Sequence, residues 1–222
     1  MGKTTLVSNF AAHAALIEFL PVAFFSLSLP KKSLAKLILR VADSAAYKEF
    51  GSGFLSDKYN LNISKDSNLP NFPIFIDDYG TLSAQDIRAR AHSLKQEFDL
   101  KLIIVDYIQL IMFSSPGLER REAISEITRT LKALAKELEV CVIVMVQLSR
   151  KVRLRGGRPV LYDLMDSGIP EQEADLIMFI SDWNDNTSNM VELIVAKQRQ
   201  GSLGKAILAF NKGFRRFESL EL

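Results

Sequence analysis

Short, nearly continuous apolar runs alternate with segments of helical periodicity along this chain, and this alternation restricts the possible folds more than any other feature of the sequence. The runs cover residues 22–27, 74–76, 102–105, 140–146 and 176–180. Strands that are covered on both faces, as in parallel sheets, are typically apolar at successive positions. Strands that alternate with helices form βαβ units. The pattern therefore predicts an α/β fold in which helices flank a mainly parallel sheet.

Two helices have clear signals between these runs. Ser83 is followed three residues later by Asp86, a pairing that predicts a capping box and a helix through Phe98. Within residues 121–139, apolar side chains recur at intervals of three and four residues, which is the spacing of an amphipathic helix.

The C-terminal third has a different pattern. Residues 191–195, which are apolar except for Glu192, and the apolar residues 206–210 flank a polar turn that contains glycine. This pattern predicts antiparallel strands added at the sheet edge. Loops are expected at residues 51–73, 114–120, 150–168 and 182–189. With 222 residues, of which 48% are hydrophobic, the chain is long enough for one α/β domain with a full core. We therefore expect a single domain over residues 1–222.

Composition narrows the functional classes. The net charge is only +2, so any contact with nucleic acid would have to come from a local basic patch. Cys141 is the only cysteine, which excludes a disulfide framework and favours a reducing, cytoplasmic setting. No apolar stretch reaches the roughly 18 residues that span a bilayer, so no membrane partner is expected. His13 and His92 each stand alone, and we expect no metal site other than one for Mg²⁺.

The first residues contain a candidate phosphate-binding loop. Gly2-Lys3-Thr4-Thr5 precedes a helical segment and matches the second half of a Walker A loop. Backbone N–H groups at the helix start would hold phosphate, Lys3 would meet the β and γ oxygens of a nucleotide, and the Thr4 hydroxyl would ligate Mg²⁺. The alternative is a chance Gly-Lys-Thr start.

A candidate Walker B aspartate follows the third apolar run. Asp106 comes directly after residues 102–105, at the carboxyl end of the expected strand, where open α/β sheets bind their ligands. From there a carboxylate can reach Mg²⁺. The alternative is an aspartate that merely ends a strand or caps a helix, and the pair Asp77 and Asp78 competes for the same role.

A basic segment follows Gln147. Five basic residues fall within nine positions, with two glycines between them: Arg150, Lys151, Arg153, Arg155 and Arg158. A flexible positive loop can follow the backbone of single-stranded nucleic acid without reading its sequence. The alternative is an ordinary solvated surface.

The segment 104–110, Ile-Val-Asp-Tyr-Ile-Gln-Leu, closely resembles the Walker B segment of DnaB-type replicative helicases. Further matching blocks follow the same order along the chain: 25–27, 76–78, 88–91, 126–127, 131–138, 147–150, 167–169, 171–179, 197–201 and 216–217. The resemblance runs from residue 2 to about residue 218 and implies a RecA-like P-loop NTPase fold. RecA-type recombinases and circadian-type ATPases share this fold, but blocks 107–110 and 197–201 favour the helicase family.

The resemblance implies an ATP site shared between subunits. In the family, the loop and Walker B residues bind MgATP, with a threonine and an aspartate at the metal; these residues correspond here to Gly2, Lys3, Thr4, Thr5 and Asp106. Gln147 corresponds to the glutamine that senses the γ-phosphate. The family forms hexameric rings, so Lys197 and an arginine finger, Arg199, would act on the nucleotide of a neighbouring subunit. The alternatives are a polar residue ending a strand for Gln147, and a solvated basic strand end for Lys197 and Arg199.

The resemblance also implies a DNA site and a function. The basic segment 150–158 would face the central channel of the ring, and the backbone N–H of Gly168 would contact DNA phosphate. The implied activity is an ATP-dependent helicase that translocates on single-stranded DNA during replication, for a bacterium, phage or plasmid. A helicase loader, an initiator and a primase are candidate partners.

The chain departs from the family pattern in three respects, of which Ser28 and the incomplete loop favour an alternative function. Ser28 stands where the family has the glutamate that activates the attacking water, and Met165 stands where it has an arginine near DNA phosphate. The chain is also expected to lack the first core strand and the first half of the Walker A loop. The alternative is a non-hydrolysing DNA-binding or ring-assembly subunit derived from such a helicase.

Overall fold

The structure is a computed structural model, which describes residues 2–50, 72–113, 119–165, 169–182 and 189–220. A four-stranded parallel sheet forms its centre, with the strand order β2-β1-β3-β4. The strands are β1 (Val22–Ser26), β2 (Ile74–Asp77), β3 (Leu102–Asp106) and β4 (Cys141–Val144). The parallel sheet predicted from the first four apolar runs is therefore confirmed.

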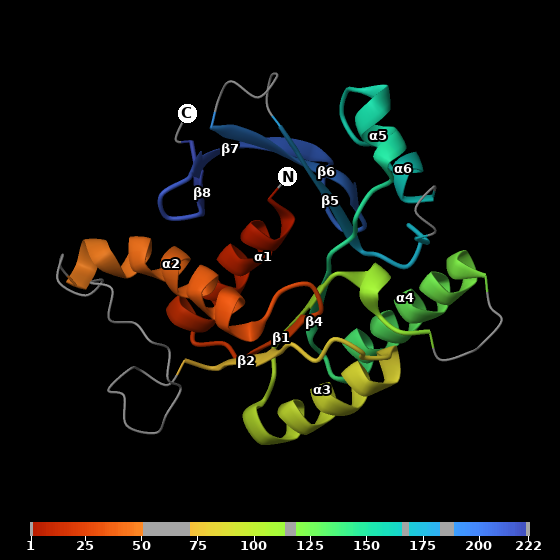
Figure 1. Cartoon of the computed structure of the whole chain (residues 1–222), viewed down its shortest axis with the longest axis horizontal. Coiled ribbons are helices and arrows are strands. Elements are labelled where there is room, and N and C mark those ends of the chain that lie inside the picture. Colours follow the sequence, from red (N-terminus) through yellow and green to blue (C-terminus); the bar gives the residue numbers. More distant parts are fainter. Residues whose placement is uncertain (1, 51–71, 114–118, 166–168, 183–188, 221–222) are drawn as a thin grey trace.

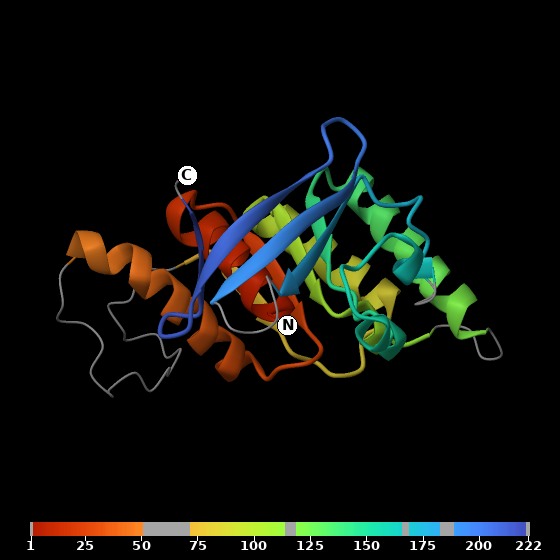
Figure 2. The same cartoon turned by 90° about the horizontal axis from the view of Figure 1, so that it is seen from above.

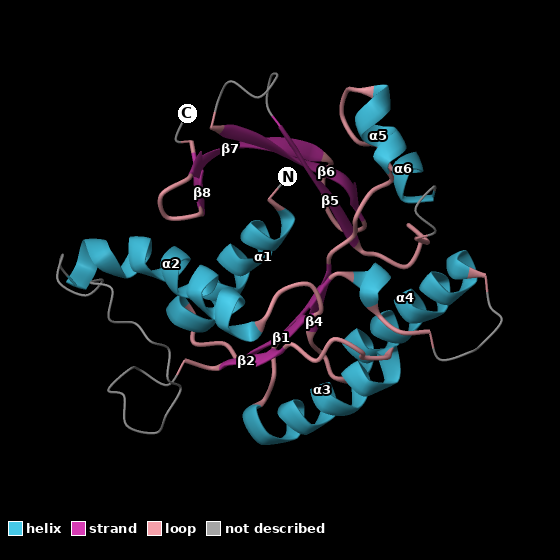
Figure 3. Ribbon diagram, viewed as in Figure 1, coloured by secondary structure: helices cyan, strands magenta, loops and turns pink. Residues whose placement is uncertain are grey.

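Helices cover both faces of this sheet (Figure 1 and Figure 3). One face carries α1 (Lys3–Ala12), its π-helical continuation η1 (His13–Ile17) and α2 (Lys31–Phe50). The other face carries α3 (Ala84–Phe98) and α4 (Arg120–Glu137). The predicted capping box is present: the Ser83 side chain accepts from the Asp86 N–H, and the Asp86 carboxylate accepts from the Ser83 N–H.

The central strands are apolar at successive positions because each face meets a different helix pair. In β1, Phe24 packs against the α1 and α2 side chains, whereas Phe25 packs with those of α3 and α4. In β3, Ile104 and Val105 divide in the same way. All residues of β1 and β3 are buried, so the carboxyl ends of two rigid neighbouring strands are fixed at one edge of the sheet.

A second, four-stranded antiparallel sheet has the strand order β5-β6-β7-β8. Its strands are β5 (Leu176–Asp182), β6 (Met190–Gln198), β7 (Gly204–Asn211) and β8 (Arg216–Ser219). The pairing of β6 with β7 confirms the predicted antiparallel strands. These strands form a separate sheet, however, and are not added at the edge of the parallel one. The fifth apolar run, however, forms β5 and pairs antiparallel with β6, so it is not a strand of the parallel sheet.

The antiparallel sheet lies over α1, which is between the two sheets in Figure 1, and its strands cross in front of α1 in Figure 2. Asn9 fastens α1 to the β7–β8 hairpin, because its Nδ2 donates to the Arg215 carbonyl at 3.1 Å and its Oδ1 accepts from the Phe217 N–H at 3.0 Å. The C-terminal strands therefore hold the first helix of the chain against the parallel sheet.

The expected loop over residues 150–168 is wrong in part. This segment contains two short helices, α5 (Arg150–Arg155) and α6 (Tyr162–Met165). The expected loops at residues 51–73, 114–120 and 182–189 lie mostly outside the described residues. Among the helices that are described, none has the length and apolar character required to cross a bilayer.

Candidate nucleotide-binding site

Three side chains from separate elements meet at the carboxyl edge of the parallel sheet. Asp106 ends β3 and is buried. Its Oδ2 accepts a hydrogen bond from the Thr4 hydroxyl at 2.7 Å and a second from the Ser28 hydroxyl at 3.2 Å. Thr4 lies in the first turn of α1, and Ser28 lies in the turn that follows β1. The sequence assigned Thr4 and Asp106 to one metal site, whereas it gave no prediction of a contact between Ser28 and Asp106.

The sheet register explains why these residues meet. Ser26, the last residue of β1, is paired with Asp106, the last residue of β3, and the Leu27 N–H donates to the Asp106 carbonyl at 2.9 Å. The two chains therefore leave the sheet side by side. Parallel strands present their carboxyl ends at a common edge, which is where ligands bind in open α/β sheets.

The competing acid pair is engaged in contacts that hold the fold. Asp78 Oδ2 accepts from the Lys31 N–H at 2.8 Å, at the start of α2. Asp77 forms an ion pair with Arg90 of α3 and accepts from the Tyr79 N–H at 3.1 Å. Asp106 alone of these three carboxylates meets the candidate phosphate-binding segment through a hydrogen bond between described residues.

Gly2 has the backbone of a tight loop at the start of α1. Its φ is +119°, a conformation that side chains strongly disfavour, and a Cβ placed there would lie 3.2 Å from Cζ of Phe217. The Leu6 N–H donates to the Gly2 carbonyl at 2.8 Å, which starts the helix at once. Lys3 and Thr4 are partly buried and Thr5 is buried. Their backbone N–H groups belong to the first turn, which has no helical acceptor for them.

The residues at this edge fit a magnesium–nucleotide complex. Mg²⁺ prefers oxygen ligands and is commonly held by one or two protein oxygens together with substrate phosphates. The Thr4 hydroxyl and the Asp106 carboxylate are such ligands and already lie 2.7 Å apart. No acidic residue stands in the first turn of α1, so the helix start is free of negative side chains that would repel phosphate.

Gln147 follows β4 at the same edge of the sheet, three residues after Val144. Its side chain is exposed and forms no hydrogen bond with another described residue. Its main chain is held by the side chain of Gln109, for which the sequence predicted no structural role.

Lys197 and Arg199 lie together at the end of β6. The Lys197 ammonium donates to the Glu171 carbonyl at 2.7 Å, and Nη2 of Arg199 donates to the Gln172 carbonyl at 2.6 Å. Neither side chain forms a hydrogen bond with Thr4 or Asp106 within the described residues. This separation is compatible with a role towards a neighbouring subunit.

Asp175 restrains Arg199. The Arg199 N–H donates to the Asp175 carbonyl at 2.9 Å, and its guanidinium lies 3.4 Å from the Asp175 carboxylate. Lys132 of α4 forms an ion pair with the same carboxylate. The hydrogen bond from Lys132, followed by the charges of Lys132, Arg199 and Lys136, holds the pKa of Asp175 below its ordinary value, although burial acts against this.

Two members of the basic segment are bound to carboxylates within the fold. Arg155 donates to both oxygens of Asp163, at 2.8 and 3.0 Å, and this hydrogen bonding lowers the pKa of Asp163. Arg158 donates to Glu192 of β6, whose Oε1 lies 3.0 Å from Nη2 of the arginine. Burial raises the pKa of Glu192, but hydrogen bonds from Arg158 and Lys205 outweigh it and leave the pKa lowered.

The structure gives no side-chain positions for the remaining candidate DNA contacts. The side chains of Arg150, Lys151 and Arg153 lie outside the described part of the chain, as does the whole of Gly168. The predicted DNA-binding role of the basic segment stays a prediction. Asp163 and Glu192 had no sequence signal as its partners, because they lie eight and 34 residues from the arginines that they bind.

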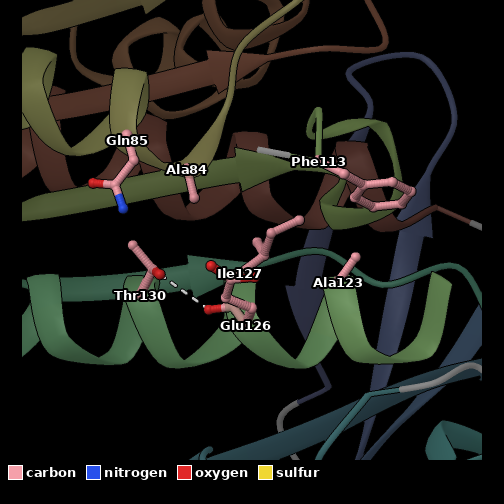
Figure 4. A pocket seen from close by; sticks show the side chains of 7 residues that line it. All are labelled: Ala84, Gln85, Phe113, Ala123, Glu126, Ile127 and Thr130. Carbon is pink, nitrogen blue, oxygen red and sulfur yellow. Dashed lines mark hydrogen bonds between the residues drawn. The ribbon is translucent and has the colours of Figure 1, made fainter. Parts of the chain in front are cut away.

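A small pocket lies on the other face of the sheet, between α3 and α4 (Figure 4). Ala84, Phe113 and Ile127 line it, with Glu126 and Thr130 at its side. The Thr130 hydroxyl donates to the Glu126 carbonyl at 3.0 Å, so this polar group is already satisfied within α4. The pocket is on the face opposite α1 and is not part of the nucleotide site.

Comparisons with known proteins agree with this geometry. Residues 1–219 match the family model described as DnaB-like helicase C terminal domain. The replicative DNA helicase DnaB of Geobacillus stearothermophilus is 40% identical over 230 aligned residues, which cover 100% of this chain and 50% of the relative. The replicative DNA helicase DnaC of Bacillus subtilis (strain 168) is 37% identical, with the same coverage of both chains. The chain thus spans about half the length of these curated relatives.

Solved structures give the same result. A solved ATPase domain superposes with a TM-score of 0.84 at 32% identity, covering 100% of this chain and 81% of that one. A DnaB-like replicative helicase, described together with its interactions with primase, also has a TM-score of 0.84, at 30% identity, over 100% of this chain and 55% of that one. A KaiC-like protein from Pyrococcus horikoshii OT3, at 17% identity and a TM-score of 0.64 over 99% of this chain and 84% of that one, shares the fold alone.

Proposed function

The chain belongs to the DnaB-like helicase C-terminal domain family, and from this membership we propose that it is the ATP-dependent motor domain of a replicative DNA helicase. The observation that carries the proposal is the 2.7 Å hydrogen bond between the Thr4 hydroxyl and the Asp106 carboxylate. It joins the helix that starts the candidate phosphate loop to the end of a buried central strand. We propose that this pair holds Mg²⁺ and that Gly2, Lys3 and Thr5 hold the phosphates of ATP.

Each residue of the site has a task that its chemistry suits. The bound metal supplies charge stabilisation for phosphoryl transfer. The backbone N–H groups of Gly2 to Thr5 point out of the first helical turn and donate to phosphate oxygens. The Lys3 ammonium neutralises charge on the β and γ oxygens. Gln147, exposed beside the same sheet edge, donates its side-chain amide to the γ-phosphate and so distinguishes ATP from ADP.

Lys197 and Arg199 are proposed to complete the site of a neighbouring subunit in a ring. Both extend from the end of β6 and meet only backbone carbonyls and Asp175 among the described residues. An arginine that reaches a γ-phosphate from outside neutralises charge in the transition state. Single-stranded DNA is the proposed track, with Arg150, Lys151, Arg153 and the Gly168 N–H as its contacts. A helicase loader, an initiator and a primase are proposed partners of the whole protein.

Ser28 favours a second candidate function. Its hydroxyl donates to Asp106 at 3.2 Å, so it is directed towards the metal corner, where the family has a glutamate that acts as base. A serine hydroxyl is a poor proton acceptor at neutral pH and does not replace that base. A subunit that binds nucleotide and DNA without hydrolysis fits this feature.

The decisive measurement is Mg²⁺-dependent ATP hydrolysis with and without single-stranded DNA. The Lys3→Ala variant removes the phosphate contact, and Lys36→Ala, at an exposed position of α2, serves as the matched control. We expect DNA-stimulated turnover that is lost in Lys3→Ala and kept in Lys36→Ala. Nucleotide binding without turnover would support the non-hydrolysing subunit, and the absence of both would refute each proposal.

A further inference from the structure

The side chain of Gln109 takes the place of a missing strand beside Gln147. Regular pairing of β3 with β4 ends at Val105 and Val144. Two more hydrogen bonds continue the ladder: the Met145 N–H donates to the Val105 carbonyl at 2.9 Å, and the Ile108 N–H donates to the Met145 carbonyl at 3.0 Å. Beyond this point the chain after β3 turns into the 3₁₀ helix η2 (Ile108–Leu110), so it offers no backbone opposite Gln147.

The Gln109 carboxamide satisfies both backbone groups of Gln147. Its Nε2 donates to the Gln147 carbonyl at 2.8 Å, and its Oε1 accepts from the Gln147 N–H at 3.2 Å. A carboxamide carries one donor group and one acceptor side by side, as a peptide group does, so it can pair with a strand as a neighbouring strand would. Glutamate keeps only the acceptor, asparagine is one methylene shorter, and methionine of similar length offers neither group.

This pairing fixes the backbone of Gln147 and leaves its side chain available. The side chain is exposed and forms no hydrogen bond with a described residue. Gln109 itself stands three residues after Asp106 on the turn that leaves β3. The two hydrogen bonds between Gln109 and Gln147, called the clamp below, therefore link the turn after Asp106 to the segment that follows β4. Helix α5 begins three residues after Gln147, at Arg150.

We propose that Gln109 is a positioning residue, which acts through the backbone of Gln147 to hold the γ-phosphate-sensing side chain in register with Asp106. The proposal rests on the proposed nucleotide-binding function. It predicts that loss of Gln109 removes discrimination between ATP and ADP without removing nucleotide binding itself, because the hydrogen bonds of Gln109 to described residues go to Gln147 and not to Gly2, Lys3 or Thr4.

The first measurement needs no nucleotide. Hydrogen exchange of the Gln147 amide, followed by NMR on the full chain, reports directly on the clamp, because an amide held by a hydrogen bond exchanges slowly. We expect Gln109→Met to speed this exchange by about tenfold or more. The matched variant Gln96→Met, at an exposed position of α3, should leave it unchanged. Equal exchange in wild type and Gln109→Met would overturn the proposal.

The second measurement compares affinities for ADP and for a non-hydrolysable ATP analogue in Mg²⁺, so it does not depend on turnover. We expect the wild-type chain to prefer the analogue, and Gln109→Met to reduce that preference roughly 5- to 10-fold, the effect of losing one or two hydrogen bonds. Affinity for ADP should stay the same. In a Gln147→Ala background, Gln109→Met should have no further effect on the ratio.

The outcomes separate the positioning role from the function on which it rests. An equal reduction by Gln109→Met with and without Gln147 would show that Gln109 acts by another route and would refute the proposal. A wild-type chain without preference for the analogue would also refute it. Failure to bind either nucleotide would refute the proposed function instead, while the exchange measurement would still decide whether Gln109 holds Gln147.

Discussion

Replacing Arg158 by methionine should destabilise the fold and leave the salt dependence of DNA binding unchanged. The Glu192 side chain is 2% exposed, whereas that of Arg158 is 59% exposed. The arginine therefore reaches from the surface to a buried carboxylate on β6. Its loss would leave Glu192 with Lys205, whose Nζ lies 3.4 Å away. We propose that Arg158 anchors the basic segment to the antiparallel sheet and is not itself a DNA contact.

The expected loss follows from this burial. A hydrogen bond to a charged group contributes about 1.5–3 kcal/mol, and breaking a fully buried ion pair costs about 3–5 kcal/mol. Because the guanidinium is solvated and Lys205 remains, we expect Arg158→Met to lower the free energy of unfolding by about 1–3 kcal/mol. With an m-value of about 2 kcal/mol/M, the urea midpoint should fall by roughly 0.5–1.5 M.

Acidification provides an internal check. The pKa of Glu192 lies below its ordinary value of 4.5 in the folded chain, so its contribution to stability is present above that pH and is lost as the pH falls through the lowered pKa. In the Arg158→Met variant, the burial of Glu192 is no longer offset by the hydrogen bonds from Arg158, and burial raises the pKa of Glu192. The stability difference between wild type and Arg158→Met should therefore be largest near neutral pH and should shrink below about pH 4.5.

Two assays decide between anchor and DNA contact. Urea unfolding, followed by circular dichroism, gives the free energy of unfolding. The number of phosphate contacts follows from the slope of log affinity for single-stranded DNA against log salt concentration, which changes by about 0.7 for each contact. Lys212→Met, which removes an exposed charge from the end of the β7–β8 hairpin, is the matched control. The double variant Arg158→Met/Glu192→Gln should recover part of the lost stability. Unchanged stability together with a slope that is shallower by about 0.7 would refute the anchor.

Three further predictions concern the site and its surroundings. Ser28→Glu should raise the rate of ATP hydrolysis in a form that binds nucleotide, and no gain in turnover would contradict the view that Ser28 marks a lost base. Met165→Arg should make the salt slope of DNA binding steeper by about 0.7, and an unchanged slope would show that this position does not face phosphate. Lys132→Ala should release Asp175 from its ion pair with Lys132 and let Arg199 move. We expect kcat to fall severalfold in assembled rings, with KM for ATP unchanged. A change confined to KM would argue against a role of Arg199 in the transition state.

The central sheet was predictable because its strands are apolar at successive positions. This pattern can be recognised in the sequence without knowledge of tertiary contacts. The run that forms β5 has the same composition, yet it joins the antiparallel sheet, because apolar character does not encode a pairing partner. Segment 150–158 contains the short helix α5, but the sequence predicted a loop there because the segment is rich in arginine and glycine. Its anchors, Asp163 and Glu192, are remote in sequence, so only the folded chain brings them to Arg155 and Arg158.

The choice among three strand-end acids shows what the fold adds to the sequence. Asp77, Asp78 and Asp106 all follow apolar runs, so composition alone leaves each of them a possible metal ligand. In the structure Asp77 binds Arg90, and Asp78 caps α2. Asp77 and Asp78 would have to break these contacts to coordinate a metal ion. Asp106 would give up only its hydrogen bonds with the Thr4 and Ser28 hydroxyls.

The hydroxyls of Thr4 and Ser28 suggest how nucleotide binding and ATP hydrolysis can be separated in one site. Thr4 and Ser28 donate to the same oxygen of Asp106, at 2.7 and 3.2 Å. In the proposed site the cation would take one oxygen from Thr4 and one from Asp106, and the serine hydroxyl can turn aside at little cost because it is neutral and short. A glutamate at residue 28 would add a negative charge beside Asp106, and the metal would have to offset their repulsion. Serine adds no such repulsion, so we expect nucleotide affinity to persist where turnover is slow.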